Sequence, residues 1–271
     1  LSDYFTKNGI AVLRYDDRGV AQSKGEFKTA TSLDFASDVE SAIAYLKTRK
    51  EINKNKIGLV GHSEGGIIAP IVASKSKDVN FIVLLAGVGI PGDQLLLLQQ
   101  ELISRVSGVN EVDTKNATAT MKRATEIIRK STNSEQLKTD LTNYIKEHSQ
   151  GPEESSKEDY IKRQVDQMTS PWMQYFIKYN PATLLEKVKC PVLAVNGEKD
   201  LQVPPKENLT AIKNALEKGG NKKVTTKEFP NLNHLFQECK TGSPNEYAAI
   251  EQTFSPIALD EITKWILNQT K

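Results

Sequence analysis

Cysteine, histidine and long apolar runs are all scarce in this sequence of 271 residues. The two cysteines, Cys190 and Cys239, are too few for a disulfide framework or for a zinc site built on cysteine. We expect two free, partly buried thiols, and a single disulfide between them stays open. No apolar run reaches the roughly 20 residues that a membrane-spanning helix needs. The sequence therefore predicts no metal site and no membrane span.

Neither sign of charge dominates the chain, which has 36 Lys and Arg against 34 Asp and Glu. Because no basic stretch stands out, composition gives no argument for binding nucleic acid or an anionic membrane. We expect a soluble protein, and because no signal-peptide pattern is visible its compartment stays open. The first residue is Leu1, and LSDYFTKNG resembles the end of an amphipathic helix closed by Gly9. We therefore expect the sequence to begin inside a longer protein.

Short apolar runs alternate with helical patterns in the first and last thirds of the chain. Runs that are buried on both faces and separated by helices are typical of a parallel sheet. The predicted strands are 10–15, 57–60, 81–86, 190–195 and 223–229. The predicted helices are 31–50, a segment ending near Lys75, 205–217, and 255–268 with Pro256 in its first turn. The alternation predicts an α/β fold.

The middle of the chain has a different pattern, because no convincing strand lies between Gly92 and Lys178. Helical periodicity and many charges indicate a helical insertion, not a disordered linker. The predicted helices are 94–106, 116–130, 134–147 and 156–168, with a turn at GPEESSKED near 151–159. We therefore predict a core made of 1–92 and 179–271 and a helical lid made of 93–178.

A serine lies between a predicted strand and a predicted helix in IGLVGHSEGGIIAPIVA, residues 57–73. This context is typical of the G-x-S-x-G nucleophile elbow, in which a strained turn exposes the serine hydroxyl. Gly61 and Gly65 would remove side chains that collide in so tight a turn. The helix N-terminus then offers the backbone N–H of Glu64 as an oxyanion donor beside Ser63. The alternative is a plain helix N-cap at Ser63.

A serine nucleophile needs a base, and the chain has only three histidines. His62 adjoins the serine, and neighbouring side chains at a strand end diverge, so it is not expected to reach the hydroxyl. His148 lies in a polar helical stretch and favours a solvated position. His234 follows the last predicted strand, where a base can lean over Ser63. The sequence therefore points to His234 as the base.

An acid follows the strand at 190–195, in the turn NGEKD. Asp200 is the preferred candidate, and Glu198 is the alternative. The order Ser63, Asp200, His234 is that of the α/β hydrolases. The chain resembles this superfamily, of the serine-hydrolase and esterase type with a helical lid. The resemblance lies in RYDDRGVAQSKG, GLVGHSEGG, CPVLAVNGEKDLQVP and PNLNHLFQ, which occur in this order.

The resemblance implies Ser63 as nucleophile, Asp200 as acid and His234 as base. The sequence departs from the family at Ala21, where the turn D-x-R-G-x-G-x-S often has a second glycine. That departure affects a structural turn and not the triad.

Several nearby polar and aromatic residues have plainer interpretations. We expect Asp16, Asp17 and Arg18 to form a structural turn with an ion pair. The Glu64 carboxylate is favourable at a helix N-terminus, and a substrate contact is the minor alternative. Trp172, Phe176 and Tyr179 lie where the insertion rejoins the core. Trp172 and Phe176 are candidates for an acyl pocket, although core packing explains them equally well.

The predicted function is hydrolysis of carboxylic esters through an acyl-enzyme, with a small-molecule acyl substrate and no cofactor. Peptide or amide hydrolysis and acyl transfer use the same triad and stay open. A noncatalytic hydrolase-like binding module is the alternative from another class.

The resemblance also implies something beyond this chain. Family members normally have several strands before the one predicted at 10–15, and a loop after one of them supplies the second oxyanion N–H. Only a helix end precedes Gly9 here. We therefore expect the N-terminal strands and the second donor to lie outside this chain. An upstream segment or a partner would complete the sheet.

Overall fold

The computed structural model describes residues 1–148 and 157–271. Most of the turn predicted at 151–159 lies outside the described residues. Contacts divide the described chain into two compact units. Unit 1 consists of 1–27, 32–90 and 180–271, and unit 2 consists of 28–31 and 91–179.

Unit 1 is built on a four-stranded parallel sheet in the order β1-β2-β3-β4. The strands are β1 (Gly58–His62), β2 (Phe81–Leu85), β3 (Val192–Gly197) and β4 (Val224–Phe229). Every residue of β2 and β3 is buried, as continuous apolar runs at the centre of a parallel sheet should be. Four of the five predicted strands are therefore confirmed.

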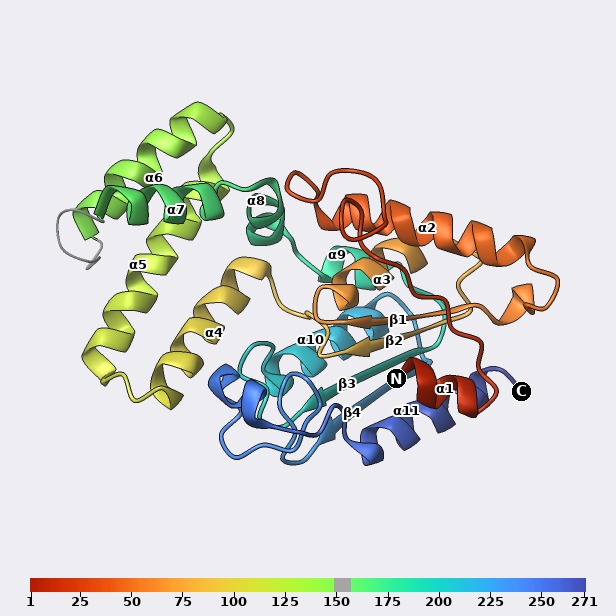
Figure 1. Cartoon of the computed structure of the whole chain (residues 1–271). Coiled ribbons are helices and arrows are strands. Elements are labelled where there is room, and N and C mark those ends of the chain that lie inside the picture. The colour runs from red at the N-terminus through yellow and green to blue at the C-terminus, as the bar shows by residue number, and fades with distance from the viewer. Residues whose placement is uncertain (149–156) are drawn as a thin grey trace. The chain divides into compact units, whose positions relative to one another are not determined.

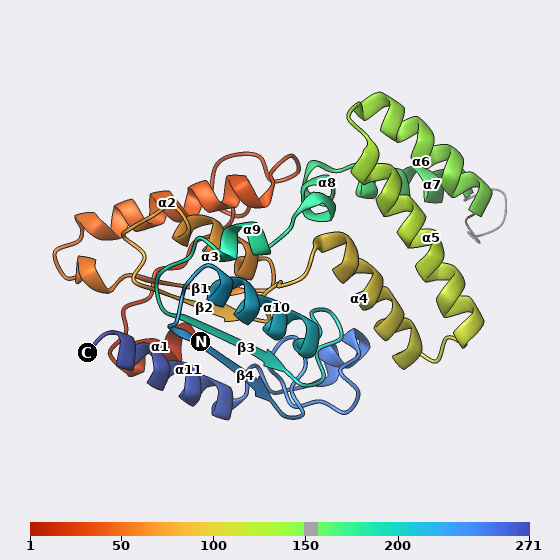
Figure 2. The same ribbon diagram turned by 180° about the vertical axis from the view of Figure 1, so that it is seen from behind.

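Helices cover both faces of this sheet, as Figures 1 and 2 show. One face carries α2 (Ser32–Thr48), α3 (Gly65–Ala73) and α10 (Pro205–Lys218), and the other carries α1 (Ser2–Lys7) and α11 (Pro256–Gln269). The short elements of unit 1 are η1 (Lys54–Lys56), α9 (Ala182–Leu185) and η2 (Pro244–Ala249). Tyr4 donates a hydrogen bond of 2.6 Å to Asp260, which ties α1 to α11.

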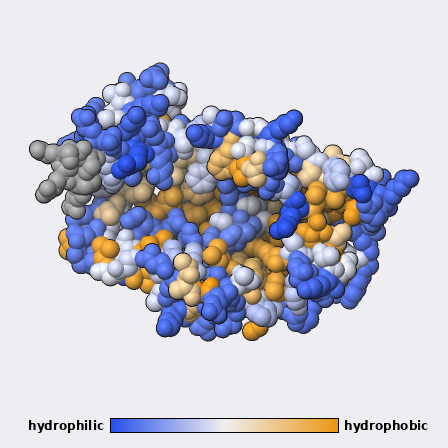
Figure 3. Space-filling model, in the orientation of Figure 1, coloured by the Kyte–Doolittle hydropathy of each residue, from blue (hydrophilic) through white to orange (hydrophobic). Residues whose placement is uncertain are grey.

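The strand predicted at 10–15 is wrong. Residues 10–17 have no regular secondary structure, and Val12, Leu13 and Tyr15 are exposed. A strand exists through hydrogen bonds to a neighbour, and the described chain places none beside this segment. Within the described chain β1 pairs with β2 alone, which leaves Val60 42% exposed. Figure 3 shows hydrophobic surface over β1 and the segment 10–17.

The turn after this segment is fastened to α2 by Arg18. Its guanidinium contacts both carboxylate oxygens of Asp38, at 2.7 and 2.8 Å, and one oxygen of Asp34 at 3.3 Å. Arg18 therefore forms an ion pair, but with Asp34 and Asp38 of α2 and not within the predicted turn of Asp16, Asp17 and Arg18. Ala21 adopts φ +47°, in the left-handed region that favours glycine. The chain thus keeps the turn conformation with an alanine.

All regular secondary structure among the described residues of unit 2 is helical. It contains α4 (Gly92–Val106), α5 (Glu111–Lys130), α6 (Ser134–His148), α7 (Lys157–Met168) and α8 (Pro171–Lys178). The helix predicted at 116–130 begins earlier because Asn110 caps it, accepting a hydrogen bond of 2.9 Å from the Asp113 N–H. The unit has its own apolar cluster, made of Ala124, Ile128, Leu137, Leu141, Ile145, Ile161, Val165 and Ile177.

Candidate active site

Ser63 lies in a strained turn directly after β1. Its φ of +53° is rare for a residue with a side chain. The turn is fixed on both sides, because the Ser63 N–H donates to the Leu85 carbonyl and the Gly66 N–H donates to the Ser63 carbonyl, both at 2.9 Å. Strain of this kind persists where surrounding structure holds it, and it concentrates at functional sites.

Two glycines make this turn possible, and one of them differs from the prediction. A Cβ on Gly61 would lie 2.1 Å from the Gly65 carbonyl oxygen, so Gly61 is required as expected. A Cβ on Gly65 would meet nothing within 4 Å, so the collision predicted for Gly65 is wrong. The second close approach is at Gly66, whose Cβ would lie 2.5 Å from the Cα of Gly87. The sequence hid this contact because Gly87 is distant along the chain.

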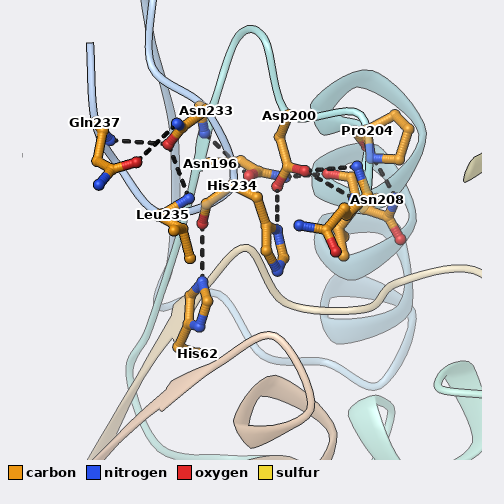
Figure 4. Close-up of polar contacts among 12 residues, drawn as sticks. His62, Asn196, Asp200, Pro204, Asn208, Asn233, His234, Leu235 and Gln237 are labelled. Atoms are coloured by element: carbon orange, nitrogen blue, oxygen red, sulfur yellow. Dashed lines mark hydrogen bonds and ion pairs between the residues drawn. The ribbon is translucent and has the colours of Figure 1, made fainter. Parts of the chain in front are cut away.

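Asp200 and His234 are brought together at the ends of β3 and β4. The His234 Nδ1–H donates a hydrogen bond of 2.8 Å to Asp200 Oδ2 (Figure 4). Only 1% of Asp200 and 5% of His234 is exposed. With Nδ1 protonated, Nε2 of His234 is the nitrogen that can accept a proton.

Backbone groups compensate the buried Asp200 carboxylate. Its Oδ1 accepts hydrogen bonds of 2.9 Å from the N–H groups of Gln202 and Val203. Together with His234, these donors satisfy a charge whose burial would otherwise be costly. A carboxylate held at both oxygens has a fixed orientation, so it fixes the orientation of the imidazole.

The loop that carries His234 is shaped by the buried Asn233. The Asn233 side-chain oxygen accepts from the N–H groups of Leu235 and Gln237, at 2.9 and 3.0 Å (Figure 4). Phe236 is fully buried with φ +60°, which makes the loop a second strained segment beside the base. Sequence reasoning located the loop but not these supports, because side-chain contacts to the backbone leave no periodic pattern.

The remaining candidates for acid and base are engaged elsewhere. The Glu198 carboxylate accepts a hydrogen bond of 2.8 Å from the Asn231 N–H. His148 is exposed on α6, where its ring stacks on Tyr144 at 4.4 Å between centroids.

Ser63 and His234 are linked through His62. The rings of His62 and His234 lie 4.7 Å apart, and His62 adjoins Ser63 in the chain. No hydrogen bond joins the Ser63 hydroxyl to His234 among the residues that the structure describes. Such bonds are often long in unliganded sites and tighten when substrate binds.

Glu64 forms the N-cap residue of α3, directly after Ser63. Its backbone N–H is thereby at the helix N-terminus, where an oxyanion is favoured. The carboxylate accepts a hydrogen bond of 2.7 Å from the buried Ser32 hydroxyl at the start of α2. This contact adds a structural role to the charge effect that the sequence indicated.

The predicted pocket residues Trp172 and Phe176 both lie on α8 of unit 2. Their rings stack at 5.2 Å with an interplanar angle of 5°. Phe176 and Tyr179 are buried, and burial raises the pKa of the Tyr179 hydroxyl. The stack therefore takes part in unit 2 packing, and its role toward a substrate stays a prediction.

The two cysteines are free thiols, and burial raises the pKa of Cys190 to about 11. Within the described ranges, no group of three or more His, Cys, Asp or Glu side chains is arranged to hold a metal ion. No helix in the same ranges is both long and apolar enough to cross a bilayer.

Residues 39–238 match the model of the family described as BAAT / Acyl-CoA thioester hydrolase C terminal. The chain belongs to this family. The match spans β1 to the loop of His234 and therefore includes Ser63, Asp200 and His234. Membership of this family agrees with the α/β-hydrolase resemblance of the sequence.

Relatives with curated sequences are distant. Esterase EstD of Thermotoga maritima is 24% identical over 267 residues, which are 97% of this chain and 54% of EstD. The chain thus spans about half the length of that relative. An uncharacterized 31.7 kDa protein of Escherichia coli, from the traX-finO intergenic region, is 23% identical over 207 residues. These residues are 75% of this chain and 67% of that protein.

Solved structures show the same fold. A monoacylglycerol lipase of Paleococcus ferrophilus matches with a TM-score of 0.53 and 16% identity, over 98% of this chain and 87% of that one. Est1E of Butyrivibrio proteoclasticus, solved with ferulic acid, matches with a TM-score of 0.53 and 15% identity, over 99% and 81%. At these identities the likeness establishes the α/β-hydrolase fold of this chain.

Proposed function

We propose that the chain hydrolyses carboxylic esters through an acyl-enzyme formed on Ser63. The observation that carries the proposal is the buried pair of His234 and Asp200, joined at 2.8 Å, together with Ser63 at φ +53° directly after β1 of the same sheet. An imidazole oriented through Nδ1 presents Nε2 as a general base. The strained turn exposes the Ser63 hydroxyl, from which that base can take the proton.

In the proposed reaction His234 Nε2 takes the Ser63 proton while Oγ attacks the acyl carbon. Asp200 stabilises the imidazolium through its bond to Nδ1. The Glu64 N–H donates to the oxyanion, and His234 then passes its proton to the departing alkoxide. Water attacks the acyl-enzyme in the second half, with the same base, and restores the Ser63 hydroxyl.

A fluorophosphonate probe tests the nucleophile directly, because it labels an activated serine without depending on the acyl substrate. We expect labelling of the native chain and none of Ser63→Ala. Ser74→Ala is the matched control, since the Ser74 hydroxyl donates to the Ile71 carbonyl within α3 and lies outside the site. Equal labelling of native chain and Ser63→Ala would contradict the proposal.

Hydrolysis of acyl thioesters is the second candidate, supported by the description of the family that matches residues 39–238. Ester and thioester substrates differ in the leaving group and share the acyl-enzyme. A panel of p-nitrophenyl esters, acyl-CoA thioesters and aminoacyl anilides, each matched in acyl chain, separates the candidates. We expect the largest kcat/KM on the esters. A larger kcat/KM on the thioesters would favour thioesterase activity, and a larger one on the anilides would favour peptidase activity.

We also propose that the helical unit of 93–178 acts as a lid that selects the acyl group, with Trp172 and Phe176 lining the acyl pocket. The stacked pair on α8 supports this proposal, because Phe176 holds the partly exposed Trp172 ring in place as an apolar contact suited to an acyl chain.

A further proposal concerns the free edge of β1. A strand from an upstream segment or a partner would cover Val60, pair with β1 and supply the second oxyanion donor. The exposed side chains of Val12, Leu13, Tyr15 and Val60 support this proposal. Hydrogen exchange tests it, since the amides of β1 should exchange more slowly when such a segment or partner is bound than in the 271-residue chain alone. Equal exchange would contradict it.

A further inference from the structure

His62 makes a contact that the proposed reaction does not yet use. Its Nε2 lies 2.8 Å from the backbone carbonyl oxygen of His234 (Figure 4). A carbonyl oxygen only accepts, so His62 carries its proton on Nε2 and donates it. The bond spans 172 positions of sequence and joins the last residue of β1 to the main chain of the candidate base.

The His62 ring also packs on the loop that it bonds. It lies 4.7 Å from the His234 ring at 48° and meets Phe236 edge-on at 6.4 Å. Phe236 in turn packs on Phe229 of β4 and on Phe254, at 6.3 and 5.1 Å. The His62 ring is therefore held against a buried aromatic group, and its donor is directed at one acceptor.

The supports of His234 fall into separate sets. Asp200 fixes the imidazole through Nδ1, and Asn233 fixes the shape of the loop from within. Both supports belong to the part of unit 1 that follows β3, and neither connects His234 to β1. The bond from His62 makes that connection, and the next residue in the chain is Ser63.

A neutral His62 is suited to its position beside His234. His62 is exposed at the end of β1, yet its pKa lies below the ordinary value. Partial desolvation by the groups packed around its ring disfavours the cation first, and a charge on His234 repels it second, although the bond to the His234 carbonyl and Asp200 act in the opposite direction. A neutral His62 can donate its hydrogen bond without opposing the positive charge that His234 gains when it takes the serine proton.

We propose that His62 is a positioning residue that sets the separation of Ser63 and His234, by tying the main chain of the base to the residue before the nucleophile. The inference rests on the proposed serine-hydrolase function. It assigns to the variable position of G-x-S-x-G a part in catalysis that involves no contact with substrate.

Three substitutions separate positioning from packing. His62→Gln places an amide N–H near the reach of Nε2, His62→Asn places one at the shorter reach of Nδ1, and His62→Leu fills volume without a donor. We expect kcat on p-nitrophenyl acetate to fall about tenfold in the Leu and Asn variants, as for the loss of one hydrogen bond, with KM within about twofold. His62→Gln should stay within about threefold of the native kcat.

Equal losses in the Gln and Leu variants, or full kcat in His62→Leu, would overturn the inference. So would a rise in KM alone, because positioning of base against nucleophile acts on the chemical step. A merely structural role would lower the unfolding midpoint of all three variants. In that case the kcat of His62→Gln would not exceed that of His62→Asn and His62→Leu.

A second readout does not depend on turnover. The proton NMR signal of the His234 Nδ1–H, bonded to Asp200, should be sharp in the native chain and in His62→Gln and broadened in His62→Leu. An unchanged signal in His62→Leu would overturn the inference. Failure of the proposed function appears separately, as a native chain that neither hydrolyses the ester nor reacts with fluorophosphonate at Ser63.

Discussion

The two units of the molecule differ in backbone strain and in the polarity of the side chains that they bury. All five described non-glycine residues with positive φ lie in unit 1, and among them are Ser63 and Phe236 beside the candidate site. Unit 1 also buries the ionisable pair of Asp200 and His234. The cluster at the centre of unit 2 is aliphatic and joins regular helices. Strain and buried polarity thus concentrate where the proposed chemistry lies, and their cost must be met by surrounding structure.

The largest expected effect tests whether the buried pair serves catalysis. Asp200→Asn keeps the shape of the side chain but favours the wrong tautomer of His234, so kcat on p-nitrophenyl acetate should fall about 10⁴-fold. Glu198→Gln is the matched control, because its carboxylate contacts the Asn231 N–H and not the base. We expect the control to retain kcat within about threefold. A larger loss in Glu198→Gln than in Asp200→Asn would reverse the assignment of the acid.

The second effect concerns stability and asks whether each unit has a core of its own. Ile128 is fully buried in the cluster of unit 2. Ile128→Ala should lower the free energy of unfolding of unit 2 by about 2–5 kcal/mol, through lost apolar contact and a cavity. Leu84→Ala in β2 should do the same to unit 1.

The two tryptophans make this comparison measurable. Trp172 belongs to unit 2 and Trp265 to unit 1. Urea unfolding followed by fluorescence in Trp265→Phe therefore reports unit 2, and in Trp172→Phe it reports unit 1. We expect Ile128→Ala to shift the first midpoint and leave the second in place. Equal shifts in both backgrounds would show that the units unfold together.

The sequence predicted regular elements well wherever one period dominated. The central strands at 81–86 and 190–195 are continuous apolar runs, and their burial in the sheet follows from that pattern alone. The segment 10–15 is also rich in β-forming residues, although it includes Arg14, and it fails to form a strand because pairing depends on a neighbour. Strand propensity therefore predicts what a segment can do once a partner is beside it.

The sequence named residues for the candidate site but not the contacts that support them. Glycine, serine, aspartate and histidine in order after strands were enough to name Ser63, Asp200 and His234. The bond from His62 to the His234 carbonyl was not, because one partner is a backbone atom and carries no residue identity. The expected divergence of neighbouring side chains directed His62 away from the Ser63 hydroxyl, and that reasoning gave no acceptor for His62.

A smaller effect tests whether the aromatic pair of unit 2 touches the acyl group. If Trp172 lines an acyl pocket, Trp172→Ala should change the ratio of kcat/KM for octanoate over acetate esters by about tenfold, since apolar contacts discriminate to that extent. Trp172→Phe keeps a ring to stack on Phe176 and should retain most of the ratio. A fall in stability with an unchanged ratio would make the pair a packing feature of unit 2.

The smallest effect is the dependence of stability on pH through His62. The pKa of His62 is lowered in the folded chain, whereas an unfolded histidine titrates at about 6.5. As pH falls through that value the unfolded chain binds a proton that folded His62 resists, so the free energy of unfolding decreases until the lower folded pKa is passed. In His62→Gln this contribution is absent, and its urea midpoint should fall less than that of the native chain between neutral and mildly acidic pH.

Solvent screening at the open edge of β1 keeps the difference small, so both chains are measured in the same buffers and the difference between them is compared. A variant that loses as much stability as the native chain over this range would show that His62 titrates alike in both states, and the neutral donor assigned to it would have to be revised.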